Sequence, residues 1–218
     1  NTTGASNTAV GTNSLIANTT GNSNVAVGET ALDANTTGSN NVAVGRYALT
    51  TSTTGYSNVA VGYATAYSIT TGFNNTAMGE SALNANTTAS NNTAVGQTSM
   101  YYTTTGANNT AVGVNSLKGN TTASNNTAVG NDSLNSNTTG AENVGIGRYA
   151  LTTNTTGANN GAMGYNSLGL NTTASNNTAI GFRSLQTNTT GTYNAAVGAN
   201  ALTANTTGGS NTAMGQGS

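Results

Sequence analysis

The sequence lacks cysteine, histidine, proline and tryptophan, and only nine of its 218 residues are charged. Without Cys and His, the chain has no thiol nucleophile, disulfide, thiolate–zinc site or imidazole general base. Four basic and five acidic residues form no electrostatic patch for nucleic acid or an anionic membrane surface. No run approaches the roughly 18 apolar residues that span a bilayer. We therefore expect no enzymatic activity, cofactor, metal, nucleic-acid partner or membrane insertion of this segment.

What the sequence does contain is Thr, Asn and Gly, which together make up 112 of the 218 residues. The hydrophobic fraction of 34% is below the usual 45–50% or so of globular domains. Disordered chains share this polarity, but they are typically rich in charge and proline. The polar residues are therefore expected to serve an ordered structure that depends on backbone pairing and small apolar side chains.

The whole sequence aligns in rows of 17 residues, with twelve full rows and a thirteenth that stops at its fourteenth position. The row consensus is N-T-T-G-x-x-N-T-A-V-G-x-x-[SA]-L-x-x, and each residue has a row position from 1 to 17. No insertion or deletion interrupts the rows. We predict a single repeat domain over residues 1–218, as a window of a longer fibre.

A row of 17 residues is too short to fold alone, and its composition opposes helix while Thr and Val favour strand. Each row is predicted to form one coil, and successive coils would pair as parallel strands about 4.8 Å apart, giving a rod of about 60 Å. The predicted fold is thus an all-β parallel β-solenoid, or β-roll, of thirteen 17-residue coils. A two-sided coil is the first expectation and a three-sided coil the alternative.

Within a coil, the alternation of Val25, Ala26 and Val27 predicts a strand with both valines on one face. We expect the valines inside, packed against Leu32, and a continuous stripe of Ala outside. Gly at row positions 4 and 11 predicts turns with positive φ. Since Ala replaces the first Gly at position 89 and in two other rows, row position 11 is the more demanding of the two.

Asn occupies row position 7 in every row, which predicts a ladder of amide side chains that hydrogen-bond from coil to coil. The ladder would comprise Asn7, Asn24, Asn41, Asn58, Asn75, Asn92, Asn109, Asn126, Asn143, Asn160, Asn177, Asn194 and Asn211. A structural role is expected for these residues in place of ligand binding.

The motif N-T-A-V-G-x-x-[SA]-L, as in 7–15 and 109–117, resembles the head repeats of trimeric autotransporter adhesins of the YadA type and related phage tail-fibre repeats. The resemblance implies a left-handed parallel β-roll, a homotrimer, and binding of extracellular matrix or other surface ligands. The row is longer than that family's coil, and the sequence shows no coiled-coil stalk or membrane anchor.

The scarce charged and aromatic side chains all lie at variable row positions, where a coil meets solvent or a partner. Glu29 and Arg46 share row position 12 in adjacent coils and could form an ion pair worth about 0–1 kcal/mol. Exposed aromatic clusters suit glycan stacking or protein contact, and contacts between chains of a fibre are an equal alternative. The candidate residues are Tyr47, Tyr56, Tyr63, Tyr67, Phe73, Tyr101, Tyr102, Tyr149, Tyr165, Phe182 and Tyr193, with Lys118 beside the Tyr101 and Tyr102 pair.

Two adjacent Thr residues per row raise the alternative of an ice-binding solenoid. Because adjacent strand residues point to opposite faces, Thr-Thr would supply one outward column and not a paired array. Ten rows also begin with Asn-Thr-Thr, which matches the N-glycosylation sequon.

We therefore expect a non-enzymatic, extracellular or cell-surface fibre segment that adheres through its exposed aromatics. Its partners would be further copies of itself, as a homotrimer, together with extracellular matrix, surface glycans or other cells. The main alternative is a self-assembling filament that stacks end to end, because neither 1–11 nor 205–218 departs from the row pattern as a capping coil would.

Overall fold

The computed structural model describes all residues, 1–218, and they form two compact units, Asn1–Asn108 and Asn109–Ser218. Every row contributes one three-residue strand at row positions 8 to 10. The strands of the first unit are β1 (Thr8–Val10), β2 (Val25–Val27), β3 (Val42–Val44), β4 (Val59–Val61), β5 (Thr76–Met78) and β6 (Thr93–Val95). Those of the second unit are β7 (Thr110–Val112), β8 (Thr127–Val129), β9 (Val144–Ile146), β10 (Gly161–Met163), β11 (Thr178–Ile180), β12 (Ala195–Val197) and β13 (Thr212–Met214).

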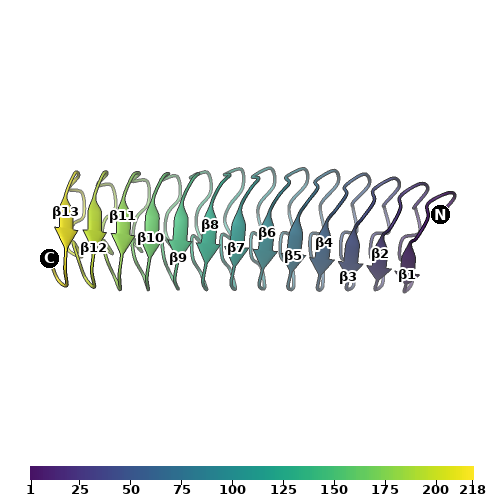
Figure 1. The fold of residues 1–218 in the computed structure, drawn as a ribbon, viewed down its shortest axis with the longest axis horizontal. Coiled ribbons are helices and arrows are strands. Elements are labelled where there is room, and N and C mark those ends of the chain that lie inside the picture. Colours follow the sequence, from purple (N-terminus) through teal and green to yellow (C-terminus); the bar gives the residue numbers. More distant parts are fainter. The chain divides into compact units, whose positions relative to one another are not determined.

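Within each unit the strands lie side by side in sequence order, and all of them run parallel (Figure 1). Each residue pairs with the same row position of the next coil, as Ala26 does with Ala43. The register is therefore set by the 17-residue row itself. This confirms the predicted all-β parallel β-solenoid of 17-residue coils.

Backbone pairing between coils continues outside the short strands. The N–H of Thr19 donates to the carbonyl of Thr36 at 2.9 Å, and the N–H of Leu32 donates to that of Ala48 at 3.0 Å. In the opposite direction, the N–H of Thr30 donates to the preceding coil at 2.9 Å. The turn-rich parts of the coil thus find backbone partners in their neighbours, which a buried peptide group requires. This explains how so polar a sequence forms an ordered structure.

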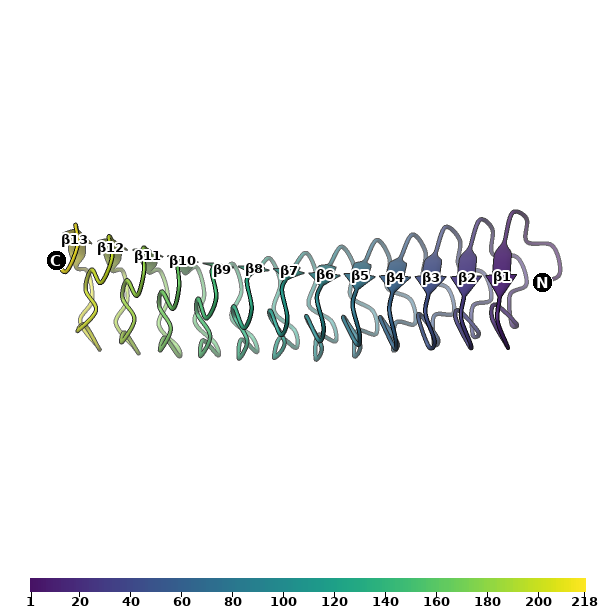
Figure 2. The same cartoon turned by 90° about the horizontal axis from the view of Figure 1, so that it is seen from below.

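The predicted orientation of the strand was wrong. Ala26 is fully buried, whereas Val25 and Val27 are only half-buried, and the same pattern recurs along the sheet. Figure 2 shows that the turn-rich remainder of each coil covers one side of the strand layer. Ala therefore faces the coil interior, and the residues at row positions 8 and 10 face outward from the uncovered side.

The coil interior is too narrow for the valine pair. The Leu at row position 15 fills it as predicted, and Leu32, Leu83 and Leu134 are each 0% exposed. A Cβ added at Gly145, the one Gly of row position 9, would already meet Ser133 Oγ at 2.6 Å and Leu134 Cγ at 3.3 Å. Since interiors are packed without spare volume, only Ala or Gly fits opposite Leu, and the larger side chains lie outside.

The turns confirm one of the two glycine predictions. Gly28 has a φ of 136°, and its neighbours at row position 11 are similar, whereas no Gly at row position 4 has positive φ. The sequence did not reveal the other left-handed residues, at row positions 6, 13 and 15. Their non-glycine φ values lie between 48° and 63° in every row, so each coil turns sharply at four places.

Candidate functional site

The Asn ladder at row position 7 is present in both units. The backbone N–H of Asn24 donates to Oδ1 of Asn7 at 2.9 Å, and that of Asn41 donates to Oδ1 of Asn24 at 3.0 Å. The Nδ2 of Asn24 donates to the carbonyl of Gly38 at 2.8 Å. The side chains of the inner coils are buried, and these bonds form the coil-to-coil amide ladder expected from the sequence.

A second amide ladder, at row position 1, was missed. In the second unit the Nδ2 of Asn154 donates to Oδ1 of Asn137 at 2.8 Å, and the Nδ2 of Asn171 donates to Oδ1 of Asn154 at 2.8 Å. In the first unit Ser52 interrupts the ladder, and the buried Oδ1 of Asn35 is left without a hydrogen-bond donor. The signal in the sequence was the recurrence of Asn at the start of ten rows.

The row-position-1 ladder determines whether the Asn-Thr-Thr sequons can be glycosylated. Their Asn side chains form the row-position-1 ladder, and those of the inner coils are at most 1% exposed. A buried Nδ2 that already donates hydrogen bonds cannot act as a sugar acceptor. In the folded chain the sequons of the inner coils are therefore closed to glycosylation.

The two Thr columns differ in exposure, as predicted. Thr at row position 3 is exposed in all thirteen rows, and it forms the single outward column. At row position 2 the hydroxyl of Thr138 donates to the carbonyl of Thr155 at 3.0 Å, and its equivalents do the same. One exposed column does not supply the flat paired array on which the ice-binding alternative depended.

The predicted ion pair is formed in the first unit. Nε of Arg46 lies 2.9 Å from Oε2 of Glu29, and both side chains are about half exposed. The same guanidinium lies 4.5 Å from the ring centroid of Tyr47 and donates to its hydroxyl at 2.7 Å. Arg46 is thus held by an acidic group on one side and an aromatic ring on the other.

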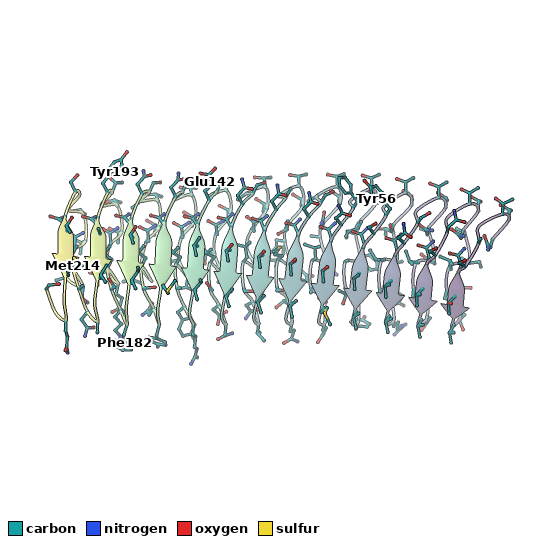
Figure 3. All side chains as sticks on the ribbon, viewed as in Figure 1. Tyr56, Glu142, Phe182, Tyr193 and Met214 are labelled. Carbon is teal, nitrogen blue, oxygen red and sulfur yellow. The ribbon has the colours of Figure 1, made fainter.

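The aromatics of the first unit form three separate groups. Tyr47 makes edge contacts with Tyr63 and Tyr67, with ring centroids 5.9 and 6.4 Å apart. Tyr56 stacks on Phe73 with the ring centroids 4.9 Å apart. Figure 3 shows Tyr56 at the upper edge of the coils. Tyr101 and Tyr102 form an edge contact at 4.7 Å. Lys118 belongs to the other unit, so its proximity to the Tyr101 pair stays a prediction.

The second unit has one continuous aromatic group and one isolated ring. Tyr149 makes an edge contact with Tyr165 at 6.0 Å, and Tyr165 stacks on Phe182 at 5.5 Å with only 15° between the rings. Tyr193 is 65% exposed and projects from the edge opposite Phe182 (Figure 3). No aromatic side chain of the protein is buried, which confirms that the coils display their aromatics.

The two units share one motif that the row pattern conceals. Gly-Arg-Tyr-Ala-Leu-Thr-Thr occurs at 45–51 and again at 147–153, six rows later, and each copy is followed one row after its Arg by a Tyr. The second copy repeats the geometry of the first: the Arg148 guanidinium lies 4.6 Å from the Tyr149 ring and donates to its hydroxyl at 2.8 Å. A comparison of variable positions between distant rows could have found this pair.

The outward side of the strands is a further apolar surface. Its residues at row position 10 are Val, Ile or Met in every row, and Met163 and Ile180 are 47% and 41% exposed. Row position 8 adds Thr or Val in most rows, such as Val144 at 39%. This surface, which we call the strand face, offers another protein one continuous column of apolar side chains at row position 10, beside an uncharged column of mainly Thr and Val at row position 8.

Neither unit contains a pocket, and neither gathers three acidic residues that could hold a metal ion. No helix with the length and apolarity of a membrane span is present. Comparisons with protein-family models, characterised proteins and solved structures found no match to the chain. The strand face and the aromatic edges are therefore the features on which a functional proposal can rest.

Proposed function

We propose that the chain is a non-enzymatic structural and adhesive segment of an extracellular or cell-surface fibre. The observation that carries this proposal is the strand face: one side of each parallel sheet is covered by its own coil, and the other side leaves the apolar column of row position 10 open to solvent. Contiguous exposed apolar surface of this kind marks an interaction site in soluble proteins. The protein would present this surface to further copies of itself.

Lateral association of identical chains supplies a suitable cover. The strand face carries no charged residue, because row positions 8 and 10 contain none in any row, so two such faces meet without a desolvated ion. The homotrimer implied by the sequence resemblance is the assembly we propose. An end-to-end filament is the alternative, and it would leave the strand face exposed.

The experiment introduces charge on the strand face without changing the coil interior. In the triple variant Ile146→Lys/Ile180→Lys/Val197→Lys, we expect folded monomers in sedimentation velocity where the unaltered chain sediments as an oligomer. The control variant Thr139→Lys/Thr173→Lys/Thr190→Lys places the same charges on the exposed Thr column of the same coils and should remain oligomeric. Circular dichroism verifies that both variants are folded.

An unchanged sedimentation coefficient in the strand-face variant, or a monomeric unaltered chain at every concentration, would contradict lateral association. The adhesive part of the proposal has a separate test on the exposed rings. Substituting Tyr63→Ser and Tyr67→Ser should weaken binding of the assembled fibre to matrix-coated or cell surfaces. Binding and assembly that both remain unchanged would argue against a role for this aromatic group.

A further inference from the structure

We propose that the second unit binds an anionic linear polysaccharide along one edge. The site, which we call the arginine edge, consists of Arg148, Tyr149, Tyr165, Phe182 and Arg183. This inference rests on the proposed adhesive function and specifies the class of ligand. The sugar chain would lie across three successive coils, with its carboxylate or sulfate groups on the two guanidinium groups.

The two guanidinium groups are held in place by aromatic rings. The Arg148 guanidinium lies 4.6 Å from the centroid of Tyr149, and the Arg183 guanidinium lies 4.9 Å from that of Phe182. Such stacking fixes the planar group and leaves its N–H donors at the rim, where they can bind an oxyanion in a bidentate manner. A fixed donor loses less conformational entropy when it binds than a freely moving one does.

Neither arginine is neutralised by an acidic residue of its unit. The only ion pair in the structure is that of Glu29 and Arg46, and no Asp or Glu occurs after Glu142. Glu142 projects from the edge opposite Phe182 (Figure 3). Asp132 lies one coil before Tyr149, beyond the end of the site away from Arg183, and accepts a hydrogen bond from Asn135 at 3.0 Å. The arginine edge is therefore cationic over its own three coils.

The equivalent edge of the first unit has similar geometry but the opposite charge. Arg46, Tyr47 and Tyr63 match Arg148, Tyr149 and Tyr165 in row position and in ring contacts. There, however, Glu29 pairs with Arg46, and Glu80 and Ser81 take the row positions that Phe182 and Arg183 have in the second unit. The chain thus contains a matched site that we expect to reject anions.

The spacing and chemistry of the arginine edge favour a polysaccharide. The two arginines are two coils apart, and at about 4.8 Å per coil this separates them by about 10 Å in the direction in which the coils stack. This distance is comparable to the length of a disaccharide. Between them the exposed rim of the Tyr165 and Phe182 stack, 38% and 46% exposed, offers an apolar surface to the C–H groups of a sugar. A nucleic acid would need many more cationic contacts than two arginines provide.

The test uses three polymers that share one backbone: dextran, carboxymethyl-dextran and dextran sulfate. We expect the unaltered full-length chain to bind the carboxymethylated or the sulfated polymer, or both, and not dextran. Which of the two binds identifies the anionic group. Calorimetry at two salt concentrations should show weaker binding at high salt, because ions screen the charge interaction.

The variant Arg148→Gln/Arg183→Gln should reduce affinity for the anionic polymer at least tenfold. Phe182→Leu, which removes the ring beneath Arg183 but keeps both charges, should reduce it several-fold. The matched control Arg46→Gln should have no effect. Conversely, Glu29→Gln/Glu80→Phe/Ser81→Arg, which copies the arginine edge onto the first unit, should create a second binding site and raise the measured stoichiometry. Thermal unfolding of each variant verifies that the fold is retained.

Three results would overturn the inference: equal binding of neutral dextran, no binding of either anionic polymer, or undiminished binding by the folded Arg148→Gln/Arg183→Gln variant. Each can be distinguished from failure of the proposed fibre function, because self-association is measured by sedimentation and depends on the strand face. If the chain self-associates but binds no polymer, only the proposed polysaccharide binding is refuted and the proposed fibre function stands.

Discussion

At the scale of single residues, asparagine supplies a polar interior that other proteins build from apolar groups. Along the row-position-7 ladder, one amide serves three partners: Oδ1 of Asn143 accepts from the backbone N–H of Asn160 at 3.0 Å and from its Nδ2 at 3.2 Å, while its own Nδ2 donates to Gly157 at 2.8 Å. A buried group that loses such a partner costs about 1–3 kcal/mol. The ladders thus make the sequence intolerant of change at positions that look merely polar.

We predict that Asn143→Ala lowers the free energy of unfolding by about 1–3 kcal/mol, because it leaves the Asn160 N–H buried without an acceptor. The Gly157 carbonyl also loses one of its two donors but keeps Nδ2 of Asn154. Chemical denaturation followed by circular dichroism measures the change. Thr156→Ala is the control: it removes an exposed hydroxyl of the outward Thr column in the next coil and should change stability by no more than about 0.5 kcal/mol. Equal losses for the two variants would contradict the ladder's role.

The carboxyl group of Asp33 is affected by its partial burial. Partial burial raises the pKa of its carboxyl above the usual value, and a hydrogen bond with the backbone of Ala34 opposes part of that increase. Because the folded state holds the proton more tightly than the unfolded state, the resulting stability is present below the ordinary pKa of Asp. It is lost as pH rises through the folded pKa.

Asp33→Asn should therefore stabilise the protein slightly at pH 7, by up to about 0.5 kcal/mol, and should have little effect at pH 3. Thermal melts at both pH values measure this difference. A variant that is less stable than the unaltered chain at pH 7 but equal to it at pH 3 would show that the fold favours the carboxylate, which is the opposite of what burial of Asp33 predicts.

At the scale of the element, each strand is a three-residue segment with its smallest side chain inside. The sequence contained this information in the restricted size of row position 9, which is Ala in twelve rows and Gly in one, whereas row position 8 accepts Thr, Val, Ala and Gly. Restriction to small residues indicates close packing. The alternation of apolar residues predicts the opposite orientation, because an alternating strand usually buries its larger side chains.

This orientation gives a pair of opposite expectations in β11. Ala179→Val inserts two methyl groups against the Leu column and should destabilise the second unit by about 1–3 kcal/mol. Ile180→Ala removes more atoms but from the side that is exposed in the single chain, and in the dissociated chain it should cost less than about 1 kcal/mol. Denaturant titration of both variants measures the two losses of stability. A larger loss for Ile180→Ala than for Ala179→Val would support the orientation first expected, with row position 10 inside the coil.

Much of the fold, and less of the candidate site, followed from the sequence. The invariant row determined the coil length, the strand position and one amide ladder, since parallel in-register stacking repeats every contact once per row. The left-handed turns at residues such as Leu32 and Tyr47 could not be foreseen, because neither side chain favours positive φ. The arginine edge was also missed, since its residues lie one or two coils apart and join only through the stacking of rows.

At the scale of the whole molecule, stability is a sum of coils and of contacts between adjacent coils. Deleting residues 69–85 removes one complete coil and joins Ser68 to Asn86 in the correct row position. We predict that this shortened chain keeps its strand signal in circular dichroism. A shorter deletion, 69–77, breaks the 17-residue register and should give an aggregated or unfolded first unit. If both deletion variants folded equally well, the fold would not depend on keeping the 17-residue register.

The direction of the backbone hydrogen bonds has a mechanical consequence. Outside the turns that close within a coil, the N–H groups of each inner coil donate mainly to the coils before and after it, so the bonds lie along the direction in which coils stack. A pull on one end of the chain meets the coils in succession, and each released coil of 17 residues adds about 55–60 Å of extended chain at about 3.3–3.6 Å per residue. Under tension, such a protein would lengthen in equal steps and absorb work at each one.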